Sequence, residues 1–436
     1  MAKRDFPTNT QDLVSNTQDL VSSAQDPISS IQDLVSNTQH PAPRTLLVTG
    51  GAGFIGSNFI HYALKEHPDW QITNLDKLTY AGNLENLKDV QDRPNYHFVK
   101  GDIADRKLVD ALLSGEYFAA NSLRSSTQDP RPSIVVNFAA ESHVDRSILD
   151  ASPFIETNIK GTQVLLEAAR THWLASSTQH LTPNPQHPAP NPQHLAPNTQ
   201  HLAPSTQHPA PNTQHLAPHV FLQVSTDEVY GSTETGKFTE KSSMAPNSPY
   251  SASKSAADLL CHAYWKSYQL PVMITRCSNN LGPFQFPEKL IPLAITNVLE
   301  NKPIPVYGDG LNVRDWIYVE DHCRALDTVL QKGKPGEVYN IGASQEKTNL
   351  ELIHRLLDIM GKPRDFITFV ADRPGHDRRY ALDAARITGE LGWKPIYSFD
   401  KALAVTVDWY LKNESWWRKI KSGEYAKYYE RMYSHR

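Results

Sequence analysis

A glycine-rich turn between an apolar run and a helical pattern most constrains the fold of this chain. Residues 45–49 read Thr-Leu-Leu-Val-Thr, glycines follow at 50, 51, 53 and 56, and a helical pattern opens at Ser57. This order is typical of a dinucleotide-binding unit, in which glycines let the backbone approach a pyrophosphate at the positive end of a helix. The turn therefore predicts a bound dinucleotide.

An acidic residue indicates which dinucleotide is bound. Asp76 ends the next apolar run, twenty residues beyond Gly56. A carboxylate at this spacing accepts a hydrogen bond from a ribose 2′-hydroxyl. Its negative charge would repel a 2′-phosphate, so the sequence predicts NAD rather than NADP.

Further apolar runs at 96–99, 134–138 and 219–224 alternate with helical patterns. Strands that alternate with helices predict an α/β fold with a doubly wound, mainly parallel sheet. We expect residues 44–275 to form this Rossmann-type cofactor-binding domain. Residues 276–436 are expected to form mainly a smaller substrate-binding α/β domain, interleaved with the first.

Heptapeptide repeats interrupt the pattern at three places. Gln-Asp-Leu-Val-Ser recurs before residue 41, a Pro- and His-rich unit fills 176–218, and a fragment lies at 122–133. Adjacent apolar pairs and prolines oppose a coiled coil. We therefore predict a disordered tail at 1–43 and disordered inserts at 122–133 and 175–218. Histidines seven residues apart are poor zinc ligands, so no metal site is predicted.

Composition excludes several classes of protein. The net charge is −4 without a basic stripe, which argues against nucleic acid as a partner. The three cysteines form neither a metal-binding spacing nor a disulfide framework. Since there is no signal-like segment and no run of 18 apolar residues, a cytoplasmic protein without a membrane partner is expected.

Candidate catalytic groups follow the apolar run at 219–224. Thr226, Asp227 and Glu228 stand at the carboxyl end of this expected strand, where open α/β sheets bind ligands. Tyr250 and Lys254 are four residues apart, hence on one helical face. An ammonium near a phenol lowers the phenol pKa, so Tyr250 is a candidate acid/base. The alternative is that these residues have no catalytic role: Asp227 and Glu228 would then lie in a solvated turn, and Tyr250 and Lys254 would be exposed on a helix.

Taken together, these features resemble the extended short-chain dehydrogenase/reductase family, and within it the branch that dehydrates nucleotide-linked glucose. The resemblance covers about 44–410 apart from the repeats, and Leu281 departs from it because tyrosine is usual there. The stretches that carry it, besides the glycine turn and the Tyr-x-x-x-Lys pair, are 76–83, 139–147, 225–231, 276–280, 305–317 and 372–380.

The resemblance implies a hydro-lyase that uses NAD to convert dTDP-glucose into its 4-keto-6-deoxy derivative, in rhamnose-type sugar biosynthesis, and a homodimer through paired helices. Tyr250, assisted by Lys254, would take the C4 hydroxyl proton while a hydride leaves C4. Glu228 would remove the C5 proton and Asp227 would protonate the departing C6 hydroxyl. The hydride would then return to C6, and Thr226 would hold the C4 oxygen.

The resemblance also implies the binding residues. NAD is expected to contact Gly50, Gly53, Phe54, Ile55, Gly56, Asp76, Lys77, Leu78, Thr79, Asp102, Ile103, Ala139, Ala140, Ser142, Thr157, Tyr250, Lys254 and Asn280. The nucleotide-sugar is expected to contact His143, Thr226, Asn279, Lys289, Leu290, Pro305, Val306, Tyr307, Arg314, Asn349, Asp372, Arg373 and His376. Arginines suit the diphosphate because they bind it in bidentate fashion.

Two other functions stay open. A nucleotide-sugar 4-epimerase needs Tyr250 and Lys254 but no acid pair, so Asp227 and Glu228 discriminate against it. The chain could instead be a catalytically idle NAD-binding scaffold whose repeats bind partners. Such a scaffold would be expected to have lost catalytic residues, yet all five catalytic candidates are present. The sequence leaves the nucleotide carrier open among dTDP, UDP, CDP and GDP.

Overall fold

A computed structural model describes residues 44–121, 130–174 and 219–422 of the chain. The predicted disordered tail at 1–43 and the long insert at 175–218 lie outside the described residues. Most of the short insert at 122–133 lies outside them as well.

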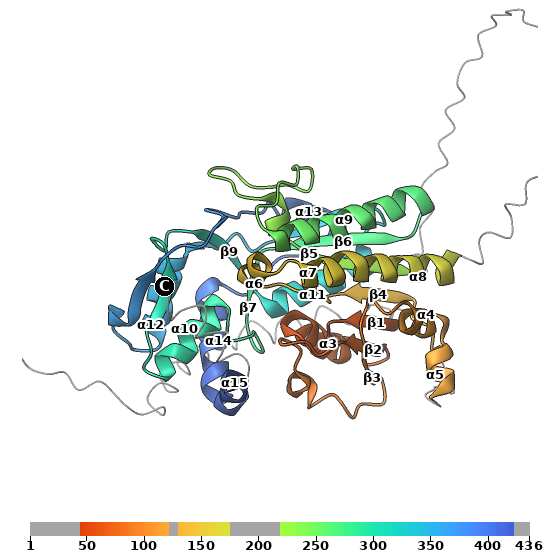
Figure 1. Ribbon diagram of the computed structural model, residues 1–436, viewed down its shortest axis with the longest axis horizontal. Coiled ribbons are helices and arrows are strands. Elements are labelled where there is room, and N and C mark those ends of the chain that lie inside the picture. Colours follow the sequence, from red (N-terminus) through yellow and green to blue (C-terminus); the bar gives the residue numbers. More distant parts are fainter. Residues whose placement is uncertain (1–43, 122–129, 175–218, 423–436) are drawn as a thin grey trace, which may run out of the picture.

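A seven-stranded sheet forms the larger part of the molecule, in the order β10-β6-β5-β4-β1-β2-β3 (Figure 1). All its neighbours pair in parallel, and the strand order reverses between β1 and β4. Such a reversal opens a ligand crevice at the carboxyl ends of the strands. The predicted doubly wound fold is therefore confirmed. The strands are β1 (Thr45–Thr49), β2 (Gln71–Asp76), β3 (Tyr96–Lys100), β4 (Ile134–Asn137), β5 (Val220–Thr226), β6 (Val272–Cys277) and β10 (Val338–Ile341).

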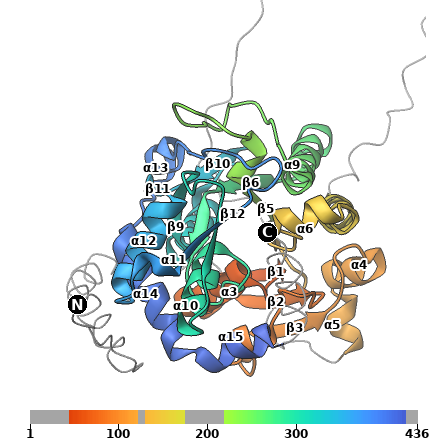
Figure 2. The same cartoon turned by 60° about the vertical axis from the view of Figure 1, so that its left-hand side comes forward.

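Helices cover both faces of this sheet, because alternate strand residues point to opposite sides. Leu46 and Val48 belong to one core and Leu47 to the other, and all three are fully buried. Figure 2 shows the two helical layers from the side. One layer contains α3 (Phe54–Glu66), α11 (Val319–Lys332) and α13 (Ala385–Leu391); the other contains α4 (Arg106–Ser114), α5 (Glu116–Ala120), α8 (Thr162–Leu174) and α9 (Pro249–Tyr268).

A second hydrophobic core lies at one end of the sheet and is built almost entirely from residues after 280. This core is consistent with the predicted second domain. Residues of β10 and α11, although they come after 276, pack in the core of the first domain. The predicted boundary at residue 275 falls inside β6. Leu281 is fully buried in this second core. The elements are β7 (Asn279–Leu281), β8 (Ile304–Tyr307), β9 (Val313–Tyr318), β11 (Glu346–Thr348), β12 (Ile367–Val370), α10 (Leu290–Leu299), α12 (Asn349–Ile359), α14 (Phe399–Lys412) and α15 (Glu414–Lys421).

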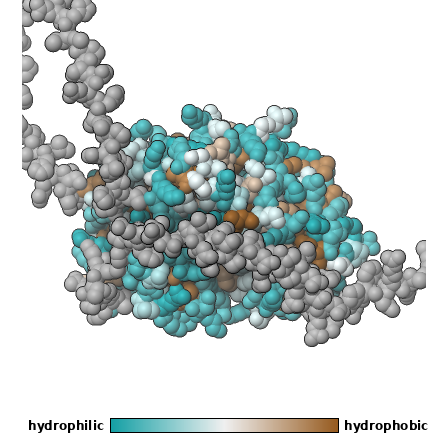
Figure 3. Space-filling view, turned by 180° about the vertical axis from the view of Figure 1, so that it is seen from behind, coloured by the Kyte–Doolittle hydropathy of each residue, from teal (hydrophilic) through white to brown (hydrophobic). Residues whose placement is uncertain are grey.

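One face of the described molecule is mainly hydrophilic where it is visible (Figure 3). Figure 3 shows one face on which hydrophobic residues are scattered among polar ones. Among the described residues, no helix combines the length and apolar composition needed to cross a membrane.

The two described ends that flank the long insert lie side by side. The rings of Trp173 and His219 stack with centroids 5.0 Å apart and planes 21° apart. Both residues stand at the amino-terminal edge of β5, whereas the glycine turn follows the carboxyl end of β1. A short connection can therefore replace the insert at the edge of the sheet opposite the ligand crevice.

We expect that deleting 176–218 and joining the ends with a short Gly/Ser linker leaves melting temperature and NAD content nearly unchanged. Loop closure costs only about 0.6 kcal/mol for each doubling of loop length. Thermal unfolding and the ratio of NAD to protein check this. A deletion protein that melts normally but loses NAD or turnover would show that the insert has a functional role.

Candidate active site

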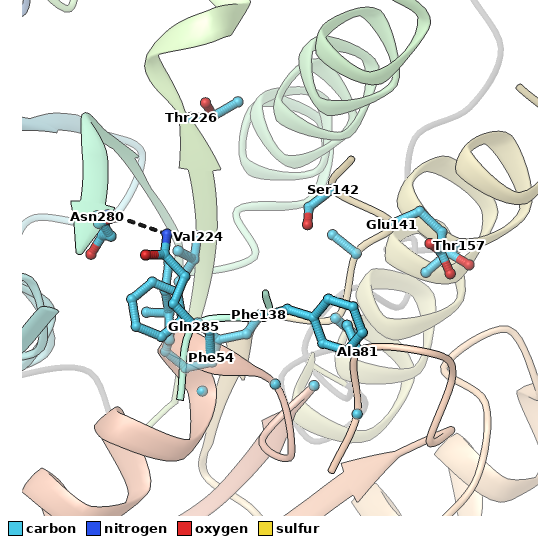
Figure 4. A pocket seen from close by; sticks show the side chains of 18 of the residues that line it. Phe54, Ala81, Phe138, Glu141, Ser142, Thr157, Val224, Thr226, Asn280 and Gln285 are labelled. Atoms are coloured by element: carbon cyan, nitrogen blue, oxygen red, sulfur yellow. Dashed lines mark hydrogen bonds between the residues drawn. The ribbon is translucent and has the colours of Figure 1, made fainter. Parts of the chain in front are cut away.

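A cavity of about 360 Å³ lies at the carboxyl ends of the parallel strands. Residues that directly follow β1, β2, β3, β4, β5 and β6 line it, together with residues of the second domain such as Lys289 and Trp316. Figure 4 shows Thr226 at the end of its strand and Asn280 beside Gln285, whose side-chain amide donates to the Asn280 carbonyl at 3.0 Å. The two domains therefore share one site.

The glycine turn forms a tight cradle at one end of the cavity. Gly50 has φ of +69°, and a Cβ added there would lie 2.6 Å from the backbone nitrogen of Ala139. A Cβ at Gly56 would lie 2.4 Å from the Gly50 carbonyl oxygen. In the described part of the chain no side chain caps the start of α3, so its first N–H groups are available to an anion. The turn thus fits a pyrophosphate.

Asp76 has a structural task that its spacing did not reveal. Its carboxylate accepts the backbone N–H of Ala52 at 2.9 Å and that of Leu78 at 2.8 Å, which fixes the glycine turn. Burial raises the pKa of Asp76, and these two hydrogen bonds oppose that shift. Asp76 is also among the residues that line the cavity, which is consistent with the predicted ribose contact. Beside it, the Lys77 ammonium forms an ion pair with the Asp102 carboxylate at 2.7 Å. This ion pair neutralises the positive charge that could otherwise attract a 2′-phosphate.

The catalytic candidates after β5 stand on a short 3-10 helix, η4 (Asp227–Tyr230). The Thr226 hydroxyl caps this helix by accepting the Glu228 N–H at 3.2 Å, and it donates to Asp227 Oδ1 at 3.2 Å. The other carboxyl oxygen of Asp227 is buried and has no hydrogen-bond partner among the described residues. Since a buried polar atom without a partner is costly, this oxygen is a candidate contact for a ligand.

The two neighbouring acids have different electrostatic surroundings. Burial raises the pKa of Asp227 well above its usual value, and the negative charge of Glu228 raises it further. Burial also raises the pKa of Glu228, but Arg373, Lys289 and Arg314 oppose this shift. Asp227 is therefore suited to keep its proton and act as an acid, whereas Glu228 is suited to act as a carboxylate base.

Tyr250 and Lys254 lie on the first turns of α9, which begins with a capping box formed by Ser248 and Ser251. Burial and the charge of Glu228 raise the pKa of the Tyr250 phenol well above its usual value, although a hydrogen bond with Thr226 lowers it. Lys254 donates to the carbonyl oxygen of Val224 at 2.8 Å. The net shift is therefore opposite to the one expected from this lysine, because burial is the larger effect, and the pairing of Tyr250 with Lys254 stays a prediction.

A buried arginine connects the two segments that carry the catalytic candidates. Arg276 on β6 donates to Asp258 on α9 at 2.9 Å and to the Tyr230 hydroxyl on η4 at 2.9 Å. Its guanidinium also lies over the Tyr230 ring, 4.8 Å from the centroid. This arginine fixes the acid pair relative to the helix that carries Tyr250.

Almost all residues predicted to bind NAD meet at the cavity. Leu78 is the exception, since only its backbone N–H is engaged, with Asp76. Asn280 is held by His322, whose Nδ1 lies 2.9 Å from the Asn280 side-chain oxygen. The predicted residues that line the cavity are Gly50, Gly53, Phe54, Ile55, Gly56, Asp76, Lys77, Thr79, Asp102, Ile103, Ala139, Ala140, Ser142, Thr157, Tyr250, Lys254 and Asn280.

The residues predicted to bind the nucleotide-sugar divide into two groups. Thr226, Asn279, Lys289 and Leu290 line the cavity. The others do not line it; they lie at the start of α6 (Val144–Leu149), on β8 and β9, at the start of α12 and after β12. Val306 is 1% exposed and packs in the second core, so its side chain cannot contact a substrate. This second group comprises His143, Pro305, Val306, Tyr307, Arg314, Asn349, Asp372, Arg373 and His376.

Buried Asp145 organises part of this second group, which the sequence did not indicate. It accepts the Tyr307 hydroxyl at 3.0 Å and the Arg373 guanidinium at 3.1 Å. Arg314 lies over the Tyr380 ring at 4.1 Å and donates to a backbone carbonyl at 2.8 Å. Arg314 and Arg373 are close enough to Glu228 to act on its pKa, so this group adjoins the acid pair.

Sequence reasoning missed several residues that line the cavity, notably Tyr80, Glu141, Gln285 and Glu288. Tyr80 and Glu288 are 208 positions apart, yet the Tyr80 hydroxyl donates to Glu288 at 3.0 Å. No local spacing could reveal this pair, because it depends on how the second domain closes against the first.

Known proteins resemble this chain over most of its length. A dTDP-glucose 4,6-dehydratase of Xanthomonas campestris is 47% identical over 391 residues, which cover 87% of this chain and 97% of the relative. A solved dTDP-glucose 4,6-dehydratase of Bacillus anthracis in complex with NAD has 45% identity and a TM-score of 0.68, covering 87% of this chain and all of that one. One from Streptomyces venezuelae, also with NAD, has 44% identity and a TM-score of 0.71, covering 86% of this chain and all of that one.

The family model described as "NAD dependent epimerase/dehydratase family" matches residues 46–342. This span runs from β1 to the end of β10 and so includes the glycine turn, the acid pair and α9. By this match and by its relatives, the chain belongs to the NAD-dependent epimerase/dehydratase family.

Proposed function

We propose that the protein is a hydro-lyase that uses NAD to convert dTDP-glucose into dTDP-4-keto-6-deoxyglucose. One observation carries this proposal: two adjacent acids with different electrostatic surroundings, the buried Asp227 and the partly buried Glu228, line the same cavity as Tyr250 and the glycine turn. The relatives named dTDP-glucose 4,6-dehydratase support the same reaction and the same carrier.

NAD, when bound, supplies a positive ring that favours phenolate, accepts a hydride from C4 and returns it to C6. Tyr250, as phenolate, takes the C4 hydroxyl proton, and Thr226 lies within hydrogen-bond reach of it. The C4 ketone makes the C5 proton acidic, and Glu228 removes it. Asp227 gives its proton to the departing C6 hydroxyl, so water leaves. When the hydride returns to C6, C5 takes up a proton, which completes the 4-keto-6-deoxy product.

The acid pair favours a dehydratase over a 4-epimerase. An epimerase only moves a hydride and a proton at C4, for which Tyr250 suffices. Withdrawing two adjacent carboxyl groups from water, Asp227 fully and Glu228 partly, costs free energy unless they have a function or a partner. An idle scaffold has no need for Asp227 to be 2% exposed with an unpartnered oxygen.

We assign the nucleotide diphosphate to the residues of the second group that lie near Glu228. Arg314 and Arg373 suit a diphosphate through bidentate hydrogen bonds. Tyr307 and His376, whose rings lie edge to face with centroids 6.2 Å apart, offer an aromatic surface for the base. A structure with NAD and the nucleotide-sugar bound checks each assigned residue by its contacts.

The proposed function is tested by incubating the NAD-loaded protein with dTDP-, UDP-, CDP- and GDP-glucose. We expect the 4-keto-6-deoxy product from dTDP-glucose at the highest rate, detected by NMR or mass spectrometry. Conversion of an NDP-glucose into its C4 epimer without loss of water would show an epimerase instead. No conversion of any of them would overturn the proposal.

We expect Asp227→Asn together with Glu228→Gln to block elimination while sparing hydride transfer from C4. The variant should therefore accumulate NADH after mixing with substrate, which absorbance detects in a single turnover. Because burial raises the pKa of Asp227, elimination by the wild type should slow as pH rises through that pKa and the acid loses its proton. Full product formation by the double variant contradicts the assigned roles.

We further propose a homodimer through the helices that surround α9. Leu259 on α9 is 55% exposed, Leu149 at the end of α6 is 50% exposed and Ile155 at the start of η2 (Ile155–Gly161) is 54% exposed. Both α6 and η2 pack against α9. Exposed hydrophobic residues on neighbouring helices mark an interaction surface. Sedimentation should therefore detect a dimer that Leu259→Glu weakens; a monomeric wild type at micromolar concentration contradicts this.

A further inference from the structure

Three side chains form a bridge between the two domains at the cavity: Tyr80 from the loop after β2, Arg146 from α6 and Glu288 from the loop before α10. The Tyr80 hydroxyl donates to Glu288 Oε1 at 3.0 Å, and Arg146 Nε donates to Glu288 Oε2 at 3.2 Å. The Arg146 guanidinium lies over the Tyr80 ring, 3.8 Å from the centroid. Each member of this bridge therefore contacts the other two.

The bridge closes one wall of the cofactor cavity. Tyr80 lines this cavity together with Ala81 and Gly82 on the first-domain loop, and Glu288 lines it together with Phe286 on the second-domain loop. The Tyr80 and Phe286 rings also meet edge to face, with centroids 5.4 Å apart. Since both loops line the cavity and are bonded to each other, the wall opens only when these contacts break.

The hydrogen bonds of the bridge make it costly to separate the two loops. Glu288 is 6% exposed, and two donors satisfy its two oxygens. Removing one partner of a buried carboxylate leaves an oxygen without its hydrogen bond, which is costly. Separating the two loops would break both bonds while Glu288 is still mostly buried.

We propose that the Tyr80–Glu288–Arg146 bridge is a latch that keeps NAD in the protein between turnovers. This inference rests on the proposed function, in which NAD ends each turnover in the redox state in which it began. A dehydrogenase that exchanges NADH for NAD needs its wall to open in every cycle. A dehydratase that returns the hydride does not, so a closed wall is compatible with rapid turnover.

The test measures NAD release without any sugar. The protein is loaded with radiolabelled NAD, mixed with an excess of unlabelled NAD, and the label still bound is counted over time. Tyr80→Phe removes one hydrogen bond to a charged group but keeps the ring on Arg146 and Phe286. We expect it to release NAD about 10- to 100-fold faster than the wild type. Arg146→Lys, which removes the planar donor, should accelerate release in the same direction.

A matched control exists on the first domain. Tyr62 on α3 donates to the Asp327 carboxylate at 3.3 Å and does not line the cavity. Tyr62→Phe therefore removes the same kind of bond elsewhere, and its release rate should equal that of the wild type. Melting temperatures of all variants verify that they are folded.

Equal release rates in Tyr80→Phe, Arg146→Lys and Tyr62→Phe would overturn the latch. Faster release in Tyr62→Phe as well would also overturn it, since loosening of the whole domain would explain the effect. The outcome is independent of the sugar reaction: failure of the dehydration assay with fast release from Tyr80→Phe would reject the proposed function and retain the latch.

Discussion

The site depends on two adjacent carboxyl groups at the end of β5, of which Asp227 is buried and Glu228 is partly buried. Removing two acids from water is costly, and the fold offsets this cost unequally. Burial raises the pKa of both acids, and Arg373, Lys289 and Arg314 lower the pKa of Glu228. Of these three cations Arg314 also lowers the pKa of Asp227, but the charge of Glu228 raises it, and one Asp227 oxygen has no hydrogen-bond partner among the described residues. This asymmetry suits Asp227 to the proposed role of proton donor and Glu228 to the proposed role of proton acceptor.

The asymmetry requires both domains to be present. Glu228 belongs to the first domain, but the three cations that act on it come from the second. Arg276 binds η4 to α9, so that the acid pair and Tyr250 move as one unit. The residue before Lys289 is Glu288, which is bonded to Tyr80 and Arg146. Closure of the wall and placement of a catalytic charge therefore depend on the same loop.

The sequence predicted well what local pattern controls. The glycine turn, Asp76 at the end of β2 and the polar residues after β5 follow from strand–turn–helix order, because parallel strands bring their carboxyl ends to one edge. The sequence did not predict the properties that depend on contacts between distant segments. Burial raises the pKa of Tyr250 against the expected effect of Lys254, and the second task of Asp76 depends on where the Ala52 amide lies.

Contacts between distant segments were beyond sequence reasoning for the same reason. The Tyr80–Glu288 bond and the role of Asp145 as acceptor for Tyr307 and Arg373 have no periodic signature. Val306 was expected at the substrate, yet an alternating strand sends its side chain into the second core. The repeats at 1–43 and 175–218 lie outside the described residues, so their predicted disorder stays a prediction.

The central claim is that one cavity moves a hydride from C4 to C6 of the same sugar. The most direct measurement uses dTDP-glucose labelled with deuterium at C4 and follows the label by NMR. Deuterium at C6 of the 4-keto-6-deoxy product, with a solvent hydrogen at C5, is the predicted result. Deuterium retained at C4 of an epimerised sugar, or lost to solvent, would contradict it.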